Sequence, residues 1–413
     1  MFFRKNTPYF RANQITYGLA LICIISIIIS ILLLYLFPLS IFPEPTGYYE
    51  VGTTSLHLVD RSRLELCDSG ERSYRELMAQ IWYPSERLEG EKALYLKDQR
   101  LVPHKLPFIH LGLVRTNSVE NAPAARIDPS YPVILYSPSW NGYRTENTFL
   151  SEELASHGFI VIALEHPCAV PLAIYPSGKI VRGNLPAPDY TSSDQALINF
   201  LRLGDEQVLL RTQDIIFVIN ELSAINEGKI QTPLTHLLAL DRMGIFGYSF
   251  GGAVAAESCF QDGRLKAGLN MDGLLFGRVA EEGTSQPFFF MNSDYPRPTF
   301  SDLNSSNGTF RRDSEINALG YERMDNWIKR YGGYYLTLLN SSHVDFSDTP
   351  LRSRLRTLKL NNHTPAIRSS KILSSYVVAF FREYLQDFHS SLLDDGTNNI
   401  YPEVSYRHYT AIN

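Results

Sequence analysis

The serine at position 249 lies in the pentapeptide Gly247-Tyr248-Ser249-Phe250-Gly251, which presents a hydroxyl group suited to nucleophilic attack. An apolar run, 243–246, precedes this turn, and a stretch rich in small residues, 253–259, follows it. Strand, sharp turn and helix in this order form the context that a G-x-S-x-G nucleophile elbow requires. We therefore expect the serine hydroxyl to project above a sheet edge, with the backbone N–H of Phe250 free at the helix start to bind an oxyanion.

A serine nucleophile of this kind needs a base, which follows it in the chain after the acid. His343 comes directly after a β-rich run, 334–339, and a short polar linker, where this type of fold places its base. The remaining downstream histidines fall in a polar loop, in the last amphipathic helix and in the tail; they are His363, His389 and His408. We expect these three to be solvated surface residues and His343 to be the base.

The orienting acid has two candidates. Asp272 ends the apolar run 266–271, and Asp294 ends the next run, 287–293. Either carboxylate could accept a hydrogen bond from the imidazole and fix its tautomer. Generic topology, with the acid after the seventh strand, favours Asp294, whereas the known alternative position after the preceding strand favours Asp272. The residues alone leave both open.

The elements around these residues indicate an α/β protein. Continuous apolar runs at 133–136 and 159–164 are typical of parallel strands that are covered on both faces. The sequence predicts a mostly parallel central sheet with helices on both faces, the helices covering 146–157, 208–222, 313–330 and 370–385. The helix at 313–330 is expected to act as a cap, and the mixed segment 85–130 is expected to be an insertion near the substrate mouth.

The N-terminal run 15–37 is uncharged and apolar, and about 20 such residues suffice to cross a membrane. A cleavable signal has a shorter apolar core and a small-residue cleavage site, neither of which is present. Three basic residues, Arg4, Lys5 and Arg11, precede the run, whereas the following flank, 38–60, carries only acidic charges. The positive-inside rule thus predicts a single-pass anchor with a cytoplasmic N-terminus and the rest of the chain on the non-cytoplasmic side.

These features divide the chain into five parts. We expect a cytoplasmic N-terminus at 1–14, a transmembrane anchor at 15–37, a stalk at 38–55, one α/β domain at 56–390 and a C-terminal tail at 391–413. The tail is expected to be poorly ordered from Asp394.

Composition limits the partners. The chain is 44% hydrophobic and 20% charged, as for an ordinary globular domain, and its net charge of −5 comes without a basic stripe, which argues against nucleic acid. Phosphate-loop and metal-ligand motifs are missing, so we expect no cofactor and no metal. Outside the apolar run there are three cysteines, Cys67, Cys168 and Cys259, which allow at most one disulfide; we name Cys67–Cys168. The sequence does not indicate an oligomeric state.

Further segments accompany these motifs and together resemble the platelet-activating factor acetylhydrolase family, in its bacterial, dienelactone-hydrolase-like branch. They extend over roughly residues 45 to 385 and include 45–47, 51–54, 56–60, 80–84, 135–137, 142–145, 154–161, 165–166, the elbow, Asp272, 289–293 and 342–348. The resemblance implies an α/β-hydrolase fold and a serine esterase that cleaves short or oxidised acyl esters of phospholipids.

The resemblance also bears on single residues. It implies that the acid follows the sixth strand, which selects Asp272 and leaves Asp294 as the alternative. It implies a second oxyanion donor in the loop after an early strand, which places the backbone N–H of Trp140 there, although Pro138-Ser139 stands where the family more often has His-Gly. Tyr248 replaces a common histidine, and we expect its side chain to point away from the serine with little effect on the chemistry.

Two other readings remain open from the sequence. One is a broad-specificity esterase or lipase of the cutinase type. The other is a catalytically dead, anchored binding protein on a hydrolase scaffold, which the presence of both Ser249 and His343 disfavours.

Overall fold

The computed structural model describes residues 8–39, 41–65, 67, 73–86, 89–102, 108–355, 363–394 and 400–411. Within these residues an 11-stranded sheet runs in the order β13-β12-β11-β10-β9-β5-β6-β2-β1-β4-β3. Its strands are β1 (Glu50–Leu64), β2 (Tyr74–Ser85), β3 (Lys92–Leu94), β4 (Arg115–Glu120), β5 (Tyr131–Ser137), β6 (Ile160–Glu165), β9 (Leu238–Tyr248), β10 (Leu265–Met271), β11 (Phe288–Ser293), β12 (Gly333–Leu338) and β13 (Val404–Tyr409). A separate hairpin pairs β7 (Leu172–Ile174) with β8 (Ile180–Arg182).

The central strands β6, β5, β9, β10, β11 and β12 are parallel to one another. Their carboxyl ends therefore meet at one edge of the sheet, where ligands bind in open α/β sheets. Ser249 follows β9, Asp272 follows β10 and Asp294 follows β11, so three segments far apart in sequence deliver polar side chains to the same edge.

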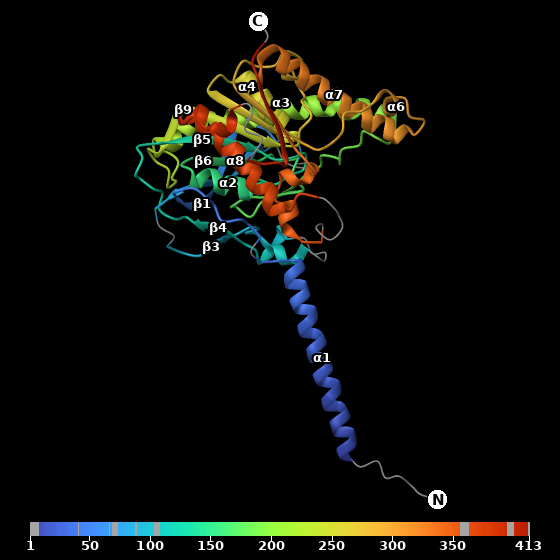
Figure 1. The fold of residues 1–413 in the computed structure, drawn as a ribbon. Helices are drawn as coiled ribbons and strands as arrows, with labels where there is room; N and C mark the ends of the chain where they lie inside the picture. Colours follow the sequence, from blue (N-terminus) through green and yellow to red (C-terminus); the bar gives the residue numbers. More distant parts are fainter. Residues whose placement is uncertain are drawn as a thin grey trace, which may run out of the picture.

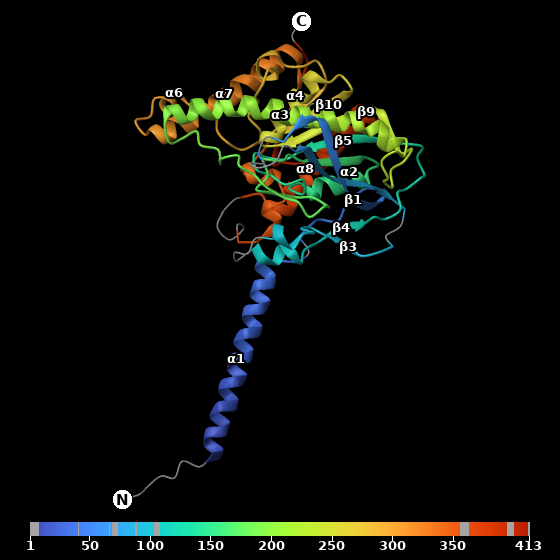
Figure 2. The same ribbon diagram turned by 180° about the vertical axis from the view of Figure 1, so that it is seen from behind.

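Helices cover both faces of the sheet, as Figures 1 and 2 show from opposite sides. The helices are α2 (Thr148–Ser156), α3 (Asp194–Asn226), α4 (Phe250–Gln261), α5 (Val279–Glu282), α6 (Phe300–Leu303), α7 (Gly308–Tyr331) and α8 (Ala366–Leu385), with short 3₁₀ turns η1 (Gln99–Leu101), η2 (Phe108–Gly112), η3 (His343–Phe346), η4 (Thr349–Arg352) and η5 (Ser391–Leu393). Two hydrophobic cores lie on the two faces of the sheet, and alternate residues of β5 pack into one or the other. Ile134 packs with residues of α2 and α8, whereas Val133 packs with residues of α3 and α4. The expected α/β architecture is confirmed.

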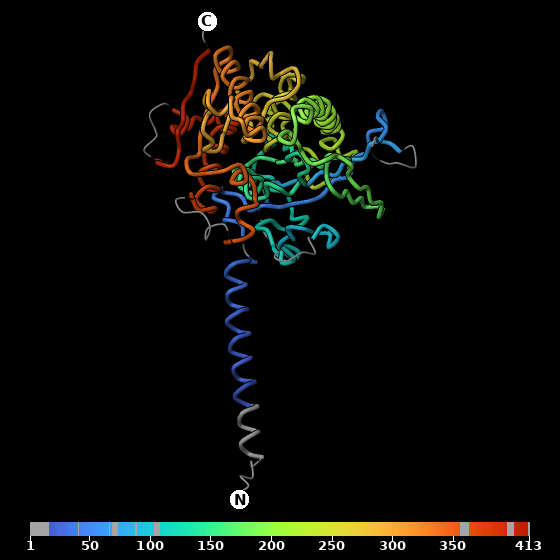
Figure 3. The backbone as a smooth tube through the Cα atoms, turned by 90° about the vertical axis from the view of Figure 1, so that its right-hand side faces the viewer, coloured from blue at the N-terminus to red at the C-terminus, as the bar shows by residue number. Residues whose placement is uncertain are grey.

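Helix α1 (Pro8–Leu36) projects from the domain as a single rod, visible in Figures 1 and 3. Its segment Thr16–Leu36 has a mean hydropathy of 3.1 and is not buried against the domain, so it is long and apolar enough to cross a membrane. The helix end is tied to the domain, because the Arg354 N–H donates to the Leu36 carbonyl (2.9 Å) and the guanidinium of Arg354 lies over the Tyr35 ring. Residues 1–7, which include Arg4 and Lys5, lie outside the described residues.

The expected stalk and tail contribute to the domain more than their sequences suggested. Ile41 and Phe42 are buried in the core, and β1 already begins at Glu50, so much of 38–55 packs on the sheet. The C-terminal strand β13 pairs antiparallel with β12 and buries Val404 and Tyr406. This pairing covers the edge of β12, whose backbone groups would otherwise lack partners.

The insertion at 85–130 was expected near the substrate mouth, and that placement is wrong. Its strands β3 and β4 extend the sheet beyond β1, because β4 pairs parallel with β1 at Gly52. The described residues of this segment therefore lie at the sheet edge remote from β9, and they line a cavity other than the one that contains Ser249.

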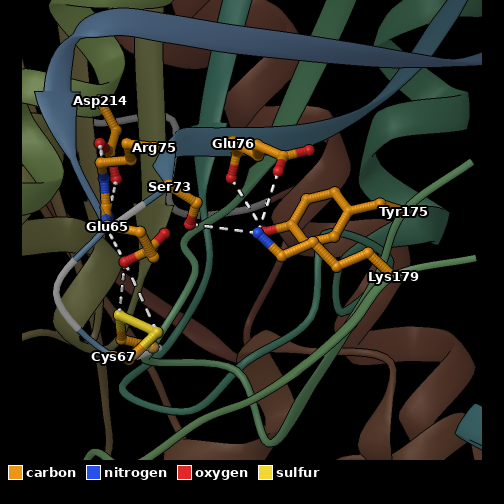
Figure 4. Close-up of a disulfide and its surroundings, with 9 residues drawn as sticks. Glu65, Cys67, Ser73, Arg75, Glu76, Tyr175, Lys179 and Asp214 are labelled. Carbon is orange, nitrogen blue, oxygen red and sulfur yellow. Dashed lines mark hydrogen bonds and ion pairs between the residues drawn. A yellow bond between two sulfur atoms is a disulfide. The ribbon is translucent and has the colours of Figure 1, made fainter. Parts of the chain in front are cut away.

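A disulfide joins Cys67 to Cys168, the pair named from the sequence, with the Cα atoms 5.3 Å apart. Figure 4 shows its surroundings, in which Arg75 lies between the carboxylates of Glu65 and Asp214. Cys259 is buried and unpaired on α4.

Candidate active site

The turn after β9 has the strained backbone of a nucleophile elbow. Ser249 adopts φ +55° and ψ −124°, a conformation that side chains rarely take, and its N–H donates to the Met271 carbonyl (2.8 Å). A Cβ atom at Gly247 would lie 1.9 Å from the Gly251 carbonyl oxygen, and one at Gly251 would lie 1.9 Å from the Ser137 carbonyl oxygen. The two glycines are therefore required by close backbone approach at this turn.

Ser249, His343 and Asp272 form a chain of two hydrogen bonds. The Oγ of Ser249 lies 2.9 Å from Nε2 of His343, and Nδ1 of His343 lies 2.7 Å from Oδ2 of Asp272. The other carboxylate oxygen of Asp272 accepts from the Ser293 N–H (2.7 Å), which fixes the carboxylate at the end of β10. Of the two acid candidates, the structure brings Asp272 to the imidazole.

Asp294 has a different partner. Its Oδ2 accepts a hydrogen bond from the N–H of Asn340 (2.8 Å), three residues before His343. Asn340 has a positive φ of 52°. Asp294 thus holds the turn that leads to the histidine.

The loop that carries His343 is fixed from several sides. Ser342 and Asp345 form a capping box around η3, and Nε2 of His363 lies 2.8 Å from Oδ2 of Asp345. His363 was expected to be a solvated loop residue, but this contact ties it to the same turn. His408 lies in β13 stacked on Tyr334, with ring centroids 4.2 Å apart.

Tyr248 was expected to have little effect on the chemistry, and the structure places its side chain against His343. Its ring stacks on the His343 imidazole at 5.0 Å between centroids, and its hydroxyl donates to the His343 carbonyl (3.1 Å). The side chain therefore contacts both the ring and the backbone of His343. The only feature of the sequence that could have indicated these contacts is the position of Tyr248 next to Ser249.

The surroundings of His343 favour the protonated form of its imidazole more than water favours it in free histidine. Desolvation lowers the pKa of His343, but the hydrogen bond and negative charge of Asp272, with the charge of Glu146, outweigh it and raise the pKa above 6.5. An imidazole of this kind is a stronger base than free histidine.

The backbone N–H groups of Phe250 and Trp140 donate no hydrogen bond within the described part of the chain. Phe250 is the first residue of α4, so its N–H is one of the unsatisfied donors of a helix start. The Trp140 ring meets the Phe250 ring edge to face at 4.7 Å, and its Nε1 donates to the Pro186 carbonyl (2.8 Å). Trp140 is thus both packed and adjacent to the elbow.

A cavity of about 820 Å³ contains the Ser249 and His343 side chains. Its wall is largely aromatic and apolar. The residues come from the 140 loop, the segment before α3, α3, α4, the loop after β10 and the expected cap helix α7: Trp140, Tyr190, Phe200, Phe250, Phe276, Ile316, Tyr321 and Met324. The charged residues in its lining are Asp272, Asp294, Asp313 and His343. Such a cavity suits the apolar part of an ester.

A second Ser-His-Asp arrangement is formed by Ser137, His166 and Asp214. Nε2 of His166 is 3.0 Å from Oγ of Ser137, and its Nδ1 is 2.9 Å from Oδ2 of Asp214. Ser137 is fully buried, so a substrate carbonyl cannot reach it. Burial lowers the pKa of His166 to about 4, which keeps it neutral near pH 7. Its two hydrogen bonds connect the end of β5 to helix α3.

Arg211 was not predicted from the sequence. This arginine is 1% exposed, and its guanidinium donates to the carbonyls of Ser139 (3.0 Å) and Trp140 (2.5 Å). It falls on the buried stripe of α3 with Val208 and Ile215. Arg211 occupies an apolar position in the pattern of an amphipathic helix, and this unusual placement could have indicated it from the sequence.

Several known proteins are similar to this chain over most of its length. Residues 37–391 match the family model of platelet-activating factor acetylhydrolase, isoform II. Platelet-activating factor acetylhydrolase from Cavia porcellus is 24% identical over 91% of this chain and 86% of its own length. A probable 1-alkyl-2-acetylglycerophosphocholine esterase from Arthroderma benhamiae is 26% identical over 67% of this chain and 66% of its own length.

A solved structure shares the fold. Ferulic acid esterase from Streptomyces cinnamoneus matches with a TM-score of 0.66 and 26% identity, over 88% of this chain and 98% of that one. Because the family model spans most of the sequence and the relatives are esterases, the chain belongs to the platelet-activating factor acetylhydrolase isoform II family of carboxylic-ester hydrolases.

Proposed function

We propose that the protein is a membrane-anchored serine esterase in which Ser249 is the nucleophile, His343 the general base and acid, and Asp272 the residue that orients the imidazole. The hydrogen-bonded chain Ser249–His343–Asp272 carries the proposal, because each contact lies within 2.7–2.9 Å in the order that the chemistry needs.

The reaction proceeds in two halves. Oγ of Ser249 attacks the ester carbonyl while its proton passes to Nε2 of His343, and the oxyanion is bound by the N–H groups of Phe250 and Trp140. The C–O bond to the alcohol then breaks, and the alcohol leaves with the proton from His343. Water attacks the acyl-enzyme by the same route, which releases the carboxylic acid and restores the serine.

The substrate class follows from the family and the cavity. Relatives are named for the acetyl ester of an ether phospholipid, and the aromatic cavity accepts an apolar group beside the serine. We propose short or oxidised acyl esters of phospholipids as substrates. The alternative is a broad-specificity esterase of the cutinase type. We test it because the solved structure that shares the fold is a ferulic acid esterase.

The anchor rests on helix α1. Its exposed apolar length fits a membrane span, and the disulfide between Cys67 and Cys168 fits an oxidising compartment on the far side of the membrane. We propose that α1 stays attached and holds the catalytic domain beside the lipids that contain its substrate.

One experiment separates these readings. The full chain and its Ser249→Ala variant are reacted with a fluorophosphonate probe and assayed on acetyl and long-chain phospholipids and on short nitrophenyl esters. The proposal predicts labelling and hydrolysis for the wild type alone, with similar thermal unfolding for both proteins, and a preference for the acetyl phospholipid. An unlabelled wild type would identify a dead binding protein, and equal rates on all esters would identify a broad esterase.

A further inference from the structure

Arg211 is a buried cation that no carboxylate neutralises by direct contact within the described residues. Its nearest acidic neighbour on α3, Asp214, is already engaged by Arg75 through two hydrogen bonds of 2.7 and 2.6 Å. Asp214 also meets Arg63 at 2.9 Å and His166 at 2.9 Å. A buried charge without an ion-pair partner is costly, so a fold retains one where it serves a purpose beyond packing.

The hydrogen bonds of Arg211 go to the loop after β5. Its Nη1 donates to the Ser139 carbonyl and its Nη2 to the Trp140 carbonyl, at 3.0 and 2.5 Å. From another side, Glu146 accepts from the N–H (2.9 Å) and the hydroxyl (2.8 Å) of Ser139. The loop is thus held between the Glu146 carboxylate and the Arg211 guanidinium, which donates to the carbonyls of Ser139 and Trp140.

The same guanidinium also contacts the elbow. It lies 4.6 Å from the centroid of the Phe250 ring and 5.9 Å from that of Trp140, within the range of a cation–π contact. One side chain therefore touches both residues whose backbone N–H groups would bind the oxyanion.

The peptide geometry makes this contact chemically specific. The carbonyl of Ser139 and the N–H of Trp140 belong to one planar peptide group. A charged donor on the carbonyl withdraws electron density from the group and makes its N–H a stronger donor, because hydrogen bonds in series polarise one another.

We propose that Arg211 is a positioning residue of the oxyanion hole: it fixes the Trp140 loop against the elbow and polarises the peptide that donates the Trp140 N–H. This inference rests on the proposed function of Ser249. Burial lowers the pKa of Arg211 to about 9, so the guanidinium remains cationic at neutral pH.

The test compares Arg211→Met, which keeps the length but removes the charge and the donors, with Arg211→Lys, which keeps the charge without the two-pronged geometry. The expected fall in kcat is about 10²-fold for Arg211→Met, as for the loss of one oxyanion donor, and smaller for Arg211→Lys, with KM little changed in both. Arg242→Met is the matched control, because Arg242 also donates to backbone carbonyls, those of Leu385 and Ser130, at the opposite end of β9.

A second readout separates positioning from folding. A trifluoromethyl ketone forms a bond from its carbonyl carbon to Oγ of Ser249, the serine proton passes to His343, and the ketone oxygen becomes an oxyanion. Its affinity should fall in proportion to kcat/KM in Arg211→Met, whereas the affinity of the matching unreactive alcohol should change by less than about threefold.

The outcomes are distinct. Equal losses for ketone and alcohol, or an unchanged kcat in either folded variant, would overturn the role of Arg211. If Arg211→Met fails to fold, Arg211→Lys decides by the same ketone-to-alcohol ratio. A wild type that neither labels with fluorophosphonate nor hydrolyses esters would instead overturn the proposed function itself.

Discussion

The phenol ring of Tyr248 lies on the imidazole of His343, with 5.0 Å between the ring centroids and 29° between the planes, and its hydroxyl donates to the carbonyl of the same histidine. Tyr248 is 4% exposed and directly precedes Ser249, so the strand that ends at Ser249 also supports His343. The distance between serine and histidine is therefore set partly by one side chain that touches the histidine twice.

Removing this support should impair catalysis more than binding. Tyr248→Ala removes both the stacked ring and the hydroxyl, and we expect kcat to fall by about tenfold to a hundredfold because small misplacements of a base have effects of this size. Tyr248→Phe keeps the ring and should lose less. Steady-state kinetics on an acetyl ester measures both, and equal kcat values for the two variants would show that stacking does not position the base.

The assignment of the acid is tested by two asparagine variants. Asp272→Asn should lower kcat by about 10⁴, because an amide cannot hold the imidazole in the required tautomer or stabilise its protonated form. Asp294→Asn should cost far less, since Asp294 accepts only from the Asn340 N–H in the turn before the histidine. If Asp294→Asn were the more damaging change, Asp294 would be the acid and the family spacing would not apply here.

The pH dependence of kcat/KM should report His343. The general base must be neutral to accept the serine proton, so activity should rise with pH through the pKa of the imidazole. Because Asp272 and Glu146 raise that pKa above 6.5, the midpoint of the acid limb should lie above 6.5. The same shift stabilises the folded protein at low pH, and this contribution is lost as pH rises through the raised pKa. A midpoint below 6.5 would contradict the electrostatic account.

Much of the site could be predicted from the sequence because its residues stand at strand ends. The elbow is recognisable from its glycines, which are needed because backbone segments approach closely there. His343 is recognisable because it follows a clear strand pattern. The choice between Asp272 and Asp294 could not be made from the residues, since both end apolar runs and only the register of β10 and β11 against the histidine loop distinguishes them.

Other features depend on contacts between distant segments. The pairing of β13 with β12 was missed because a short, polar tail gains its order from an open sheet edge that local sequence does not reveal. The insertion at 85–130 was misplaced because composition does not show which edge of the sheet a segment joins. Arg211 was overlooked since its partners are backbone carbonyls of a loop that is 71 and 72 residues away in the chain.

The disulfide should contribute to stability rather than to chemistry. Cys67 and Cys168 close a loop with a sequence separation of 101, and such cross-links contribute about 2–4 kcal/mol by restricting the unfolded chain. Replacing both with serine should lower the thermal midpoint while hydrolysis at 25 °C persists. Cys23→Ser on the exposed face of α1 is the control and should change neither. An unchanged midpoint in the double variant would show that the bond is not formed in solution.

The topology is the final test of the proposed anchor. Basic residues precede the span and acidic residues follow it, so a reporter fused after Asn413 should lie on the non-cytoplasmic side. In intact right-side-out cells, external protease should remove that reporter, and the full-length protein should stay in the membrane after an alkaline carbonate wash. Placing acidic residues at Arg4, Lys5 and Arg11, together with Glu44→Lys, reverses the charge difference and should make the reporter protected in part of the population. A protected reporter in the wild type would contradict the orientation, and a shortened, carbonate-soluble product would show that α1 is a cleaved signal. Either result would leave the chemistry at Ser249 in place and would remove the argument that the enzyme is held beside its lipid substrate.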